Sequence, residues 1–253
     1  MLMMIVLSCS SCIEVVGKTK RVIPNKQYQS KMIQVQDFDA VSVIGNCDVI
    51  FTPAAGEKSL ELYASENVID LIEVYVEGSK LVVRIKKDYN INRNNDVMEL
   101  RVSAPMIRQA KVTGSATFLV TQDCEVDDLT LGVTGSGDIL AKGIVADKVE
   151  CSVTGSGDVK VAGLSAKELT AKITGSGDVK MAGSVDEASY LVTGSGDIDA
   201  EAVQAKAVKA KVTGSGDIRC YPIESLDANR TGSGTILYKG DGVNVTAKGV
   251  RKI

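Results

Sequence analysis

A ladder of carboxylates is the feature of this sequence with the right chemistry for a site. The segment Val-Thr-Gly-Ser-Gly-Asp recurs along the second half of the chain, with one threonine and one aspartate in each copy. If the copies stack, their oxygens form a column that could hold calcium, which prefers oxygen ligands. The candidate ladder, structural or binding, comprises Thr134, Asp138, Thr154, Asp158, Thr174, Asp178, Thr193, Asp197, Thr213 and Asp217.

The same carboxylates could act as acid and base on a polysaccharide, as in lyases and hydrolases built on β-helices. Those enzymes depend on irregular clusters of acids and bases, whereas these copies are uniform. The short Gly-Gly-x-Gly-x-Asp repeat of calcium-binding β-rolls is also absent. We therefore expect no catalytic residues, no metal site and no cofactor, with calcium kept as the alternative.

A structural role is the third interpretation of the ladder. Aspartate beside glycine usually accepts hydrogen bonds from backbone amides, and we expect each carboxylate to bind the amides of its own Gly-Ser-Gly corner. Carboxylates about 4.8 Å apart repel by roughly 0.9 kcal/mol in high dielectric. A hydrogen bond to a charged acceptor returns roughly 1.5–3 kcal/mol, so the structural use outweighs the repulsion.

The composition narrows the class of protein. The chain has no histidine, which removes the usual general base and the commonest zinc ligand, and it has no tryptophan for stacking on a sugar. The net charge of −3 disfavours a nucleic-acid partner, because phosphate binding needs a basic surface. These absences favour a binding protein over an enzyme.

The element that positions the ladder is a repeat of about twenty residues. Successive threonines from Thr113 to Thr231 are separated by 21, 20, 20, 19, 20 and 18 residues. Such a period is typical of a solenoid, in which each coil buries its apolar side against its neighbours. Apolar residues alternate with polar ones around each Gly-Ser-Gly corner, which indicates strands. We therefore predict one interior row formed by Ile139, Val159, Val179, Ile198 and Ile218.

The segment 32–105 is predicted to be an N-terminal β cap that covers the open end of the solenoid. Residues 41–51 are a degenerate first coil, and residues 74–85 form an antiparallel hairpin around Gly78. Further strands are expected over residues 60–64, 69–76, 81–86 and 97–103. The polar stretch Asn90–Asp96 is interpreted as an exposed turn, with a contact loop as the alternative.

The N-terminus is similar to a bacterial lipoprotein signal. A short apolar run over residues 1–7 is followed by small residues and Cys12, the predicted site of lipidation, with Cys9 as the alternative. The competing interpretation is an ordinary apolar N-terminus with two free thiols. In the lipoprotein interpretation, residues 1–12 are the signal peptide and residues 13–31 a polar tether, and the protein reaches the membrane only through the lipid.

The far end of the solenoid is marked by breaks in the pattern. The segment 106–253 is predicted to be the solenoid with its C-terminal cap, where Arg230 replaces the usual Val or Ile and is expected to pair with an acid. Cys151 and Cys220 fall in inward columns. A disulfide among Cys47, Cys124, Cys151 and Cys220 stays open, because the sequence favours none of the pairings.

The degenerate coil, the hairpin, the segment Val102–Pro105 and the repeated corners together resemble the head-GIN-domain family of auto-transporter adhesins. The resemblance covers residues 33–238 and implies an all-β fold, a right-handed parallel β-helix, on an exported lipoprotein of the Gram-negative outer membrane or cell surface. It implies an adhesin or binding module whose partner is a glycan or an envelope or host protein. The alternatives are a polysaccharide-active enzyme and a structural envelope scaffold.

Overall fold

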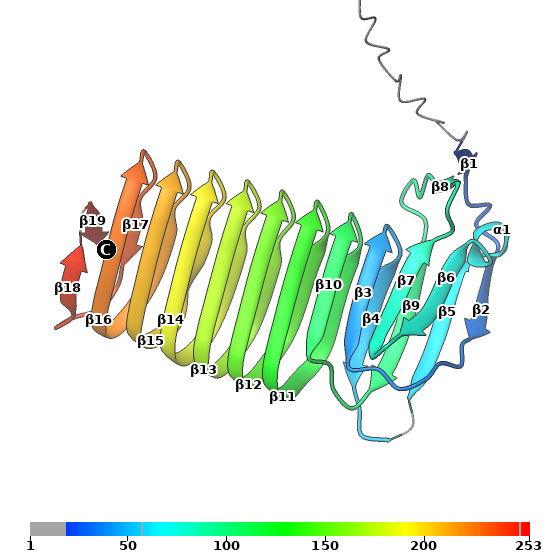
Figure 1. The fold of residues 1–253 in the computed structure, drawn as a ribbon, viewed down its shortest axis with the longest axis horizontal. Coiled ribbons are helices and arrows are strands. Elements are labelled where there is room, and N and C mark those ends of the chain that lie inside the picture. The colour runs from blue at the N-terminus through cyan, green and yellow to red at the C-terminus, as the bar shows by residue number, and fades with distance from the viewer. Residues whose placement is uncertain (1–18, 57, 248) are drawn as a thin grey trace, which may run out of the picture.

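The computed structural model describes residues 19–56, 58–247 and 249–253. They form a β-solenoid of about seven turns, with coils about 20 residues apart, which confirms the predicted fold class. Figure 1 shows the stacked coils as one rod with the N-terminal cap at one end. The predicted signal, its candidate lipidation sites Cys12 and Cys9, and the first part of the predicted tether lie outside the described residues.

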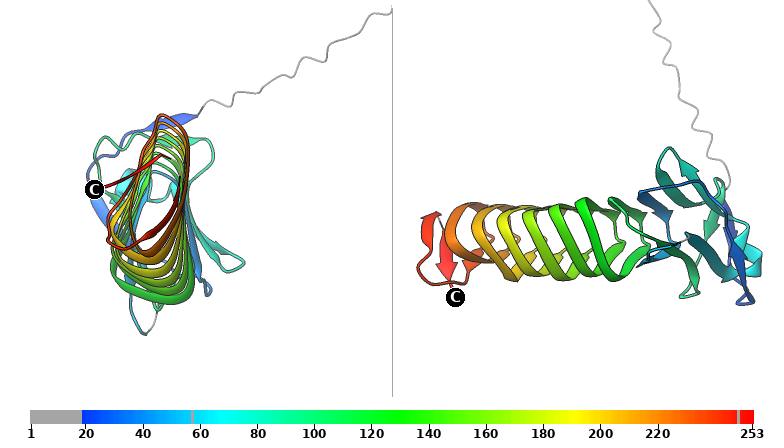
Figure 2. Two further views of the ribbon diagram at one scale, coloured as in Figure 1. Left: turned by 90° about the vertical axis from the view of Figure 1, so that its left-hand side faces the viewer. Right: turned by 90° about the horizontal axis from the view of Figure 1, so that it is seen from below.

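Each coil is one long, bent strand that pairs in parallel with the next coil along the chain. Viewed along the rod, the coils superpose on one flattened outline (Figure 2). The strands of the solenoid are β10 (Gln109–Gly114), β11 (Thr117–Gly135), β12 (Asp138–Gly155), β13 (Val159–Gly175), β14 (Val179–Gly194), β15 (Ile198–Gly214), β16 (Ile218–Gly232) and β17 (Ile236–Tyr238).

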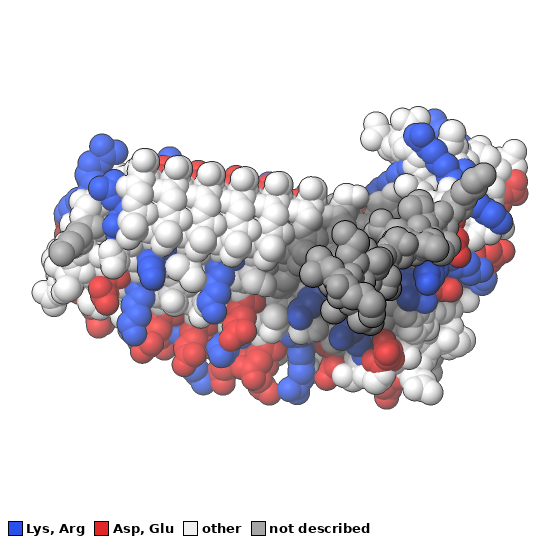
Figure 3. All heavy atoms as spheres, turned by 45° about the horizontal axis from the view of Figure 1, so that its top comes forward, with Lys and Arg blue, Asp and Glu red and all other residues white. Residues whose placement is uncertain are grey.

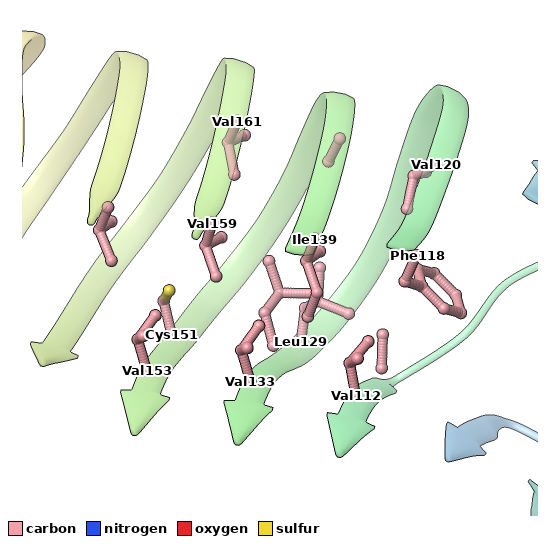
Figure 4. Close-up of a cluster of buried hydrophobic side chains, with 14 of the residues drawn as sticks. Val112, Phe118, Val120, Leu129, Val133, Ile139, Cys151, Val153, Val159 and Val161 are labelled. Carbon is pink, nitrogen blue, oxygen red and sulfur yellow. The ribbon is translucent and has the colours of Figure 1, made fainter. Parts of the chain in front are cut away.

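The predicted interior row is confirmed. Ile139, Val159, Val179, Ile198 and Ile218 are register partners in successive coils, and none is more than 1% exposed. Phe118 and Ile236 extend the row at its two ends. Figure 4 shows Phe118, Ile139 and Val159 one after another inside the coils. Each such side chain stabilises the fold by about 1.5–3 kcal/mol on burial, so like residues stacked on like supply most of the core.

The corners require glycine because neighbouring coils approach too closely there for a side chain. A Cβ atom at Gly157 would lie 1.9 Å from the carbonyl oxygen of Gly137 in the preceding coil. Gly155 has a φ of 118°, a conformation that other residues rarely adopt. Both glycines of the recurring Gly-Ser-Gly corner are therefore fixed by the stacking itself.

The cap first extends the solenoid with parallel strands and then covers its open end with antiparallel strands. β3 and β4 form the predicted degenerate coil and pair in parallel with β10 and β11, while β7 and β9 stack on their other side. Antiparallel β5, β6 and β2 finish the sheet, and the predicted hairpin at Gly78 is formed by β6 and β7. The strands are β3 (Ala40–Gly45), β4 (Asp48–Pro53), β5 (Ser59–Ser65), β6 (Ile72–Glu77), β7 (Lys80–Ile85) and β9 (Met98–Ala104).

Two predictions for the N-terminal part of the chain, one for the cap and one for the tether, are wrong in detail. The strand expected over 69–76 begins only at Ile72, because Val68 and Ile69 are buried on the short helix α1 (Glu66–Ile69). β1 (Lys20–Val22) lies within the predicted tether and pairs with β8 (Tyr89–Ile91), and β2 (Tyr28–Met32) runs from the tether into the first residue of the predicted cap and pairs with β5. α1 has four residues, and no helix in the described part of the chain is long and apolar enough to cross a membrane.

The C-terminal end is covered by β18 (Asn244–Ala247) and β19 (Val250–Lys252), which pair with β16 and β17. Arg230 forms no ion pair with any acid among the described residues, contrary to the prediction. Its Nη1 donates a hydrogen bond to the Gly234 carbonyl oxygen at 2.9 Å, which stabilises the last corner where a β-branched residue is missing. The four cysteines that could have formed a disulfide are instead buried free thiols, namely Cys47, Cys124, Cys151 and Cys220. Cys151 and Cys220 lie in the core as predicted.

Candidate functional site

The aspartates of the ladder bind the next coil rather than their own corner. Oδ1 of Asp138 accepts a hydrogen bond from the amide of Asp158 at 3.0 Å, and Asp158, Asp178 and Asp197 repeat the contact at 3.1, 2.9 and 2.7 Å. The predicted partner was wrong because the corner amides are already used. The amides of Ser156 and Gly157, for example, donate to the carbonyl oxygen of Gly135 in the preceding coil.

The ladder is therefore a set of ties between coils. One carboxylate oxygen of each ladder aspartate accepts a hydrogen bond from a backbone amide of the next coil. Nζ of Lys160 lies 3.2 Å from the other carboxylate oxygen of Asp158. Within the described residues, no group of three or more Cys, Asp or Glu side chains is placed to hold a metal ion. The corners themselves form an uncharged stripe along the edge of the rod that faces the viewer in Figure 3. The ladder threonines lie on this side in register, and all are exposed except Thr213, which is half-buried.

A polar hollow of about 710 Å³ lies in the cap and is formed by three separate segments. We call it the asparagine hollow, because five of its eight lining residues are asparagines. β1 contributes one arginine, the corner between β3 and β4 contributes one asparagine, and β8 with the loop after it contributes the rest. Its lining residues are Arg21, Asn46, Asn90, Ile91, Asn92, Arg93, Asn94 and Asn95.

Arg93 holds the loop of the asparagine hollow against the first coil. Its Nη2 lies 2.6 Å from Oδ2 of Asp48, its Nη1 donates to the Asn46 carbonyl oxygen at 3.3 Å, and its Nε donates to the Asp96 carbonyl oxygen at 2.6 Å. The hydrogen bond to Asp48 raises the pKa of the half-buried guanidinium. Asn46 in turn donates from Nδ2 to the carbonyl oxygen of Ile91 at 2.9 Å.

Asp48 connects the hollow to the solenoid. It occupies the ladder position of the first coil, and its Oδ1 accepts a hydrogen bond from the Thr117 amide at 2.8 Å, while Oδ2 binds Arg93. The next coil carries Thr117 at this position, so Asp48 makes the same kind of tie as the ladder aspartates but is separated by one coil from Asp138. The side chains that tie the coils together also fix the position of the asparagine hollow.

Asp96 fixes the other end of the loop. It is 3% exposed, and its two carboxylate oxygens accept hydrogen bonds from the Tyr28 hydroxyl and, at 2.7 Å, from the Ser65 hydroxyl. Burial alone would raise the pKa of Asp96, but the hydrogen bonds from Tyr28 and Ser65 outweigh burial and lower it. The charged form is therefore the stable one in the folded cap.

The sequence pointed to part of this site. The stretch Asn90–Asp96, predicted to be an exposed turn with a contact loop as the alternative, supplies most of the hollow. The exposed turn is wrong at Ile91, which lies on β8, and at Asp96, because both are 3% exposed. Arg21 and Asn46 were missed, because they lie far from the loop in sequence and reach it only through the β1–β8 pair and the first corner. The signal that could have found Asn46 is the concentration of asparagines in the cap compared with the repeats.

The comparisons with known proteins agree with the fold. The family model described as "Putative auto-transporter adhesin, head GIN domain" matches residues 37–164 and 141–242. Among the curated proteins compared, none matches the chain.

Several solved structures from Bacteroidetes have the same fold. One from Parabacteroides distasonis, described as a "Putative lipid binding protein", is 26% identical, with a TM-score of 0.86 over 92% of this chain and 100% of that one. A "putative adhesin" from Bacteroides fragilis is 25% identical, with a TM-score of 0.69 over 92% and 100% of the two chains. Another from Parabacteroides merdae is 24% identical, with a TM-score of 0.83 over 92% and 96%, and shows the fold alone.

Proposed function

Because the chain belongs to the head-GIN-domain family of auto-transporter adhesins, we propose that it is an exported adhesin that binds a glycan through the asparagine hollow. The observation that carries the proposal is the set of side-chain amides that converge in the hollow. Each amide offers a donor and an acceptor side by side, which suits the neighbouring hydroxyls of a sugar. The volume of the hollow lies within the range of small-molecule sites, about 300–1,000 Å³.

The rigidity of the hollow supports this proposal. Arg93 holds the middle of the loop and Asp96 its C-terminal end, so binding would not have to order it, and ordering costs are a large part of what limits affinity. Tyr89 borders an adjoining hollow that shares Asn46, Asn90 and Ile91, and the ammonium group of Lys20 lies over its ring, 5.6 Å from the ring centroid.

The alternatives fit the site less well. Lipid binding, the function named for the relative from P. distasonis, does not suit the asparagine hollow, because asparagine and arginine dominate its lining. A polysaccharide-active enzyme would need free carboxylates, whereas one oxygen of each bonded ladder aspartate is engaged by an amide. The names of the family and its structural relatives favour a non-enzymatic role.

We also propose that the mature chain is a lipoprotein of the outer membrane, acylated at Cys12 or alternatively Cys9. From Cys12 to Thr19 the chain can extend by at most about 25 Å. The asparagine hollow would then lie near the membrane, because Arg21 is part of it. This position favours a glycan of the cell envelope as the partner. Labelling with palmitate that is lost in Cys12→Ala or Cys9→Ala tests the anchor and identifies the acylated residue.

A glycan array tests the binding site. We expect the wild-type chain to bind a subset of glycans, and Asn90→Ala and Arg21→Ala to lose this binding. Asn229→Ala is the matched control, because Asn229 is an exposed asparagine on β16, away from the cap. Equal binding by Asn90→Ala and Asn229→Ala would refute the assignment. Cleavage of a bound glycan that is lost in Asp158→Ala and Asp178→Ala would instead establish the enzyme.

If no glycan binds, the structural scaffold becomes the better account of the protein.

A further inference from the structure

A second hollow lies on the wall of the solenoid, away from the cap, and differs from the first in chemistry. It is a groove of about 810 Å³ that crosses β11 to β15. Its surface is formed by alanines, larger aliphatic residues and lysines. We call it the lysine groove, and its lining residues are Leu119, Val120, Thr121, Leu140, Ala141, Lys142, Lys160, Val161, Ala162, Lys180, Met181, Ala182, Asp199, Glu201, Ala202 and Lys239.

The groove follows from two outward columns of side chains. The first column lies next to the interior row and consists of two leucines, two lysines and one aspartate. Its members, in register from β11 to β15, are Leu119, Leu140, Lys160, Lys180 and Asp199. Two residues further on in β13 and β14, Ala162 and Ala182 present only methyl groups. Ala202, the register partner of Ala182, lies three residues after Asp199, because the register shifts there. Small residues beside long ones leave a channel, and lysine stems add apolar surface to its sides.

The backbone on the side of the groove next to the interior row is already paired within the sheet, whereas the register shifts beside Ala162 and Ala182. Residues 139–141 and 159–161 are paired in parallel with both neighbouring coils, so their amides and carbonyls already take part in the sheet. A peptide lying over these paired residues would leave its own backbone groups without partners, which costs free energy. A hydrocarbon chain has no such groups and would gain from contact with the alanine methyls.

The charges at the rim indicate an anionic end on the ligand. Four lysines and two acids line the groove, so lysines exceed acids by two. Lys160 and Lys180 have carboxylate partners in Asp158 and Asp199, at 3.2 and 2.8 Å. Lys142 forms no ion pair within the described part of the chain. It lies on β12, whereas both acids of the lining lie on β15, toward the other end of the groove.

We propose that the lysine groove binds a free long-chain fatty acid. The carboxylate pairs with the ammonium group of Lys142, and the hydrocarbon tail lies along Ala162 and Ala182 toward β15. This site is separate in position and chemistry from the asparagine hollow, so it stands whether or not the hollow binds a glycan.

The test is a titration with cis-parinaric acid, a fatty acid whose fluorescence rises on transfer from water to an apolar site. We expect saturable binding to the wild-type chain, which palmitate displaces and a long-chain alcohol displaces poorly. Lys142→Glu weakens binding by about tenfold, because one favourable charge pair is lost and one unfavourable pair is gained. Ala162→Trp abolishes binding by filling the channel, with circular dichroism confirming that the variant is folded.

Lys172→Glu is the matched control for charge, because Lys172 is an exposed lysine of β13 that does not line the groove. Its affinity should stay within twofold of wild type. The proposal is overturned if the wild-type chain shows no saturable binding, or if Lys172→Glu weakens binding as much as Lys142→Glu. Displacement by the alcohol as strong as by palmitate would overturn the carboxylate contact with Lys142.

Discussion

Replacing one corner glycine tests how tightly the coils are stacked. In Gly157→Ala the new Cβ would lie 1.9 Å from the Gly137 carbonyl oxygen and 2.7 Å from a methyl carbon of Val133. Ordinary contact begins at 3.4 Å, so the coils would have to separate locally by about 1.5 Å. That movement breaks the hydrogen bonds from the amides of Gly157 and Asp158 to the preceding coil.

The expected loss is about 3–7 kcal/mol of unfolding free energy. Overpacking costs about 1–3 kcal/mol, and each broken hydrogen bond adds about 0.5–1.5 kcal/mol, or more for the one to the charged carboxylate of Asp138. The measurement is urea unfolding followed by far-ultraviolet circular dichroism.

Gly132→Ala is the control, because Gly132 has an ordinary φ and its nearest contact would be a side-chain carbon of Lys111 at 3.4 Å. We expect Gly132→Ala to be neutral or to stabilise by up to about 1 kcal/mol. If the two variants unfold at the same urea concentration, the close-packed corner is refuted.

Three further predictions follow from buried groups and from the ladder. Tyr190→Phe should raise Tm by removing about 1–3 kcal/mol of desolvation cost, because the buried Tyr190 hydroxyl has no hydrogen-bond partner among the described residues; a lower Tm in a thermal scan would contradict this. Asp96 has a lowered pKa in the folded cap, so its contribution is present above the unfolded pKa, near 3.8, and is lost as pH falls through the folded pKa. Unfolding of the wild type between pH 6 and pH 2 should therefore show an acid-induced loss of stability that is smaller in Asp96→Asn, and equal slopes for the two proteins would count against it. Finally, Tm should be unchanged by a calcium chelator, because amides occupy one oxygen of each bonded ladder aspartate; a drop in Tm that added calcium reverses would restore the metal alternative.

The repeat was predictable because every coil carries the same information. The interior row from Ile139 to Ile218 could be read directly, since a fixed period places like residues on like and alternation shows which side is buried. The partner of each aspartate was not predictable in this way. It depends on the offset between coils, which decides whether Asp138 reaches its own corner or the amide of Asp158.

The cap was predicted less well because its signals are weak or distant. All five residues of β2 are exposed, so the strand shows no alternation of buried and exposed positions. It is stabilised instead by pairing with β5 and by stacking of the Tyr28 ring on the Tyr63 ring, with the ring centroids 5.3 Å apart. The four residues of α1 are too few to show a helical period. The asparagine hollow combines residues that lie about 70 positions apart, from Arg21 to Asn90, and only the folded topology brings them together.

The most direct test of the account is to map where a glycan binds. Amide chemical shifts of the isotopically labelled chain would be followed while the best glycan from the array is added. We predict that the largest shifts occur in residues 88–97, 45–47 and 20–22, around the asparagine hollow. Shifts spread along the corners from Thr134 to Asp217, with the cap unchanged, would contradict it and assign binding to the ladder instead.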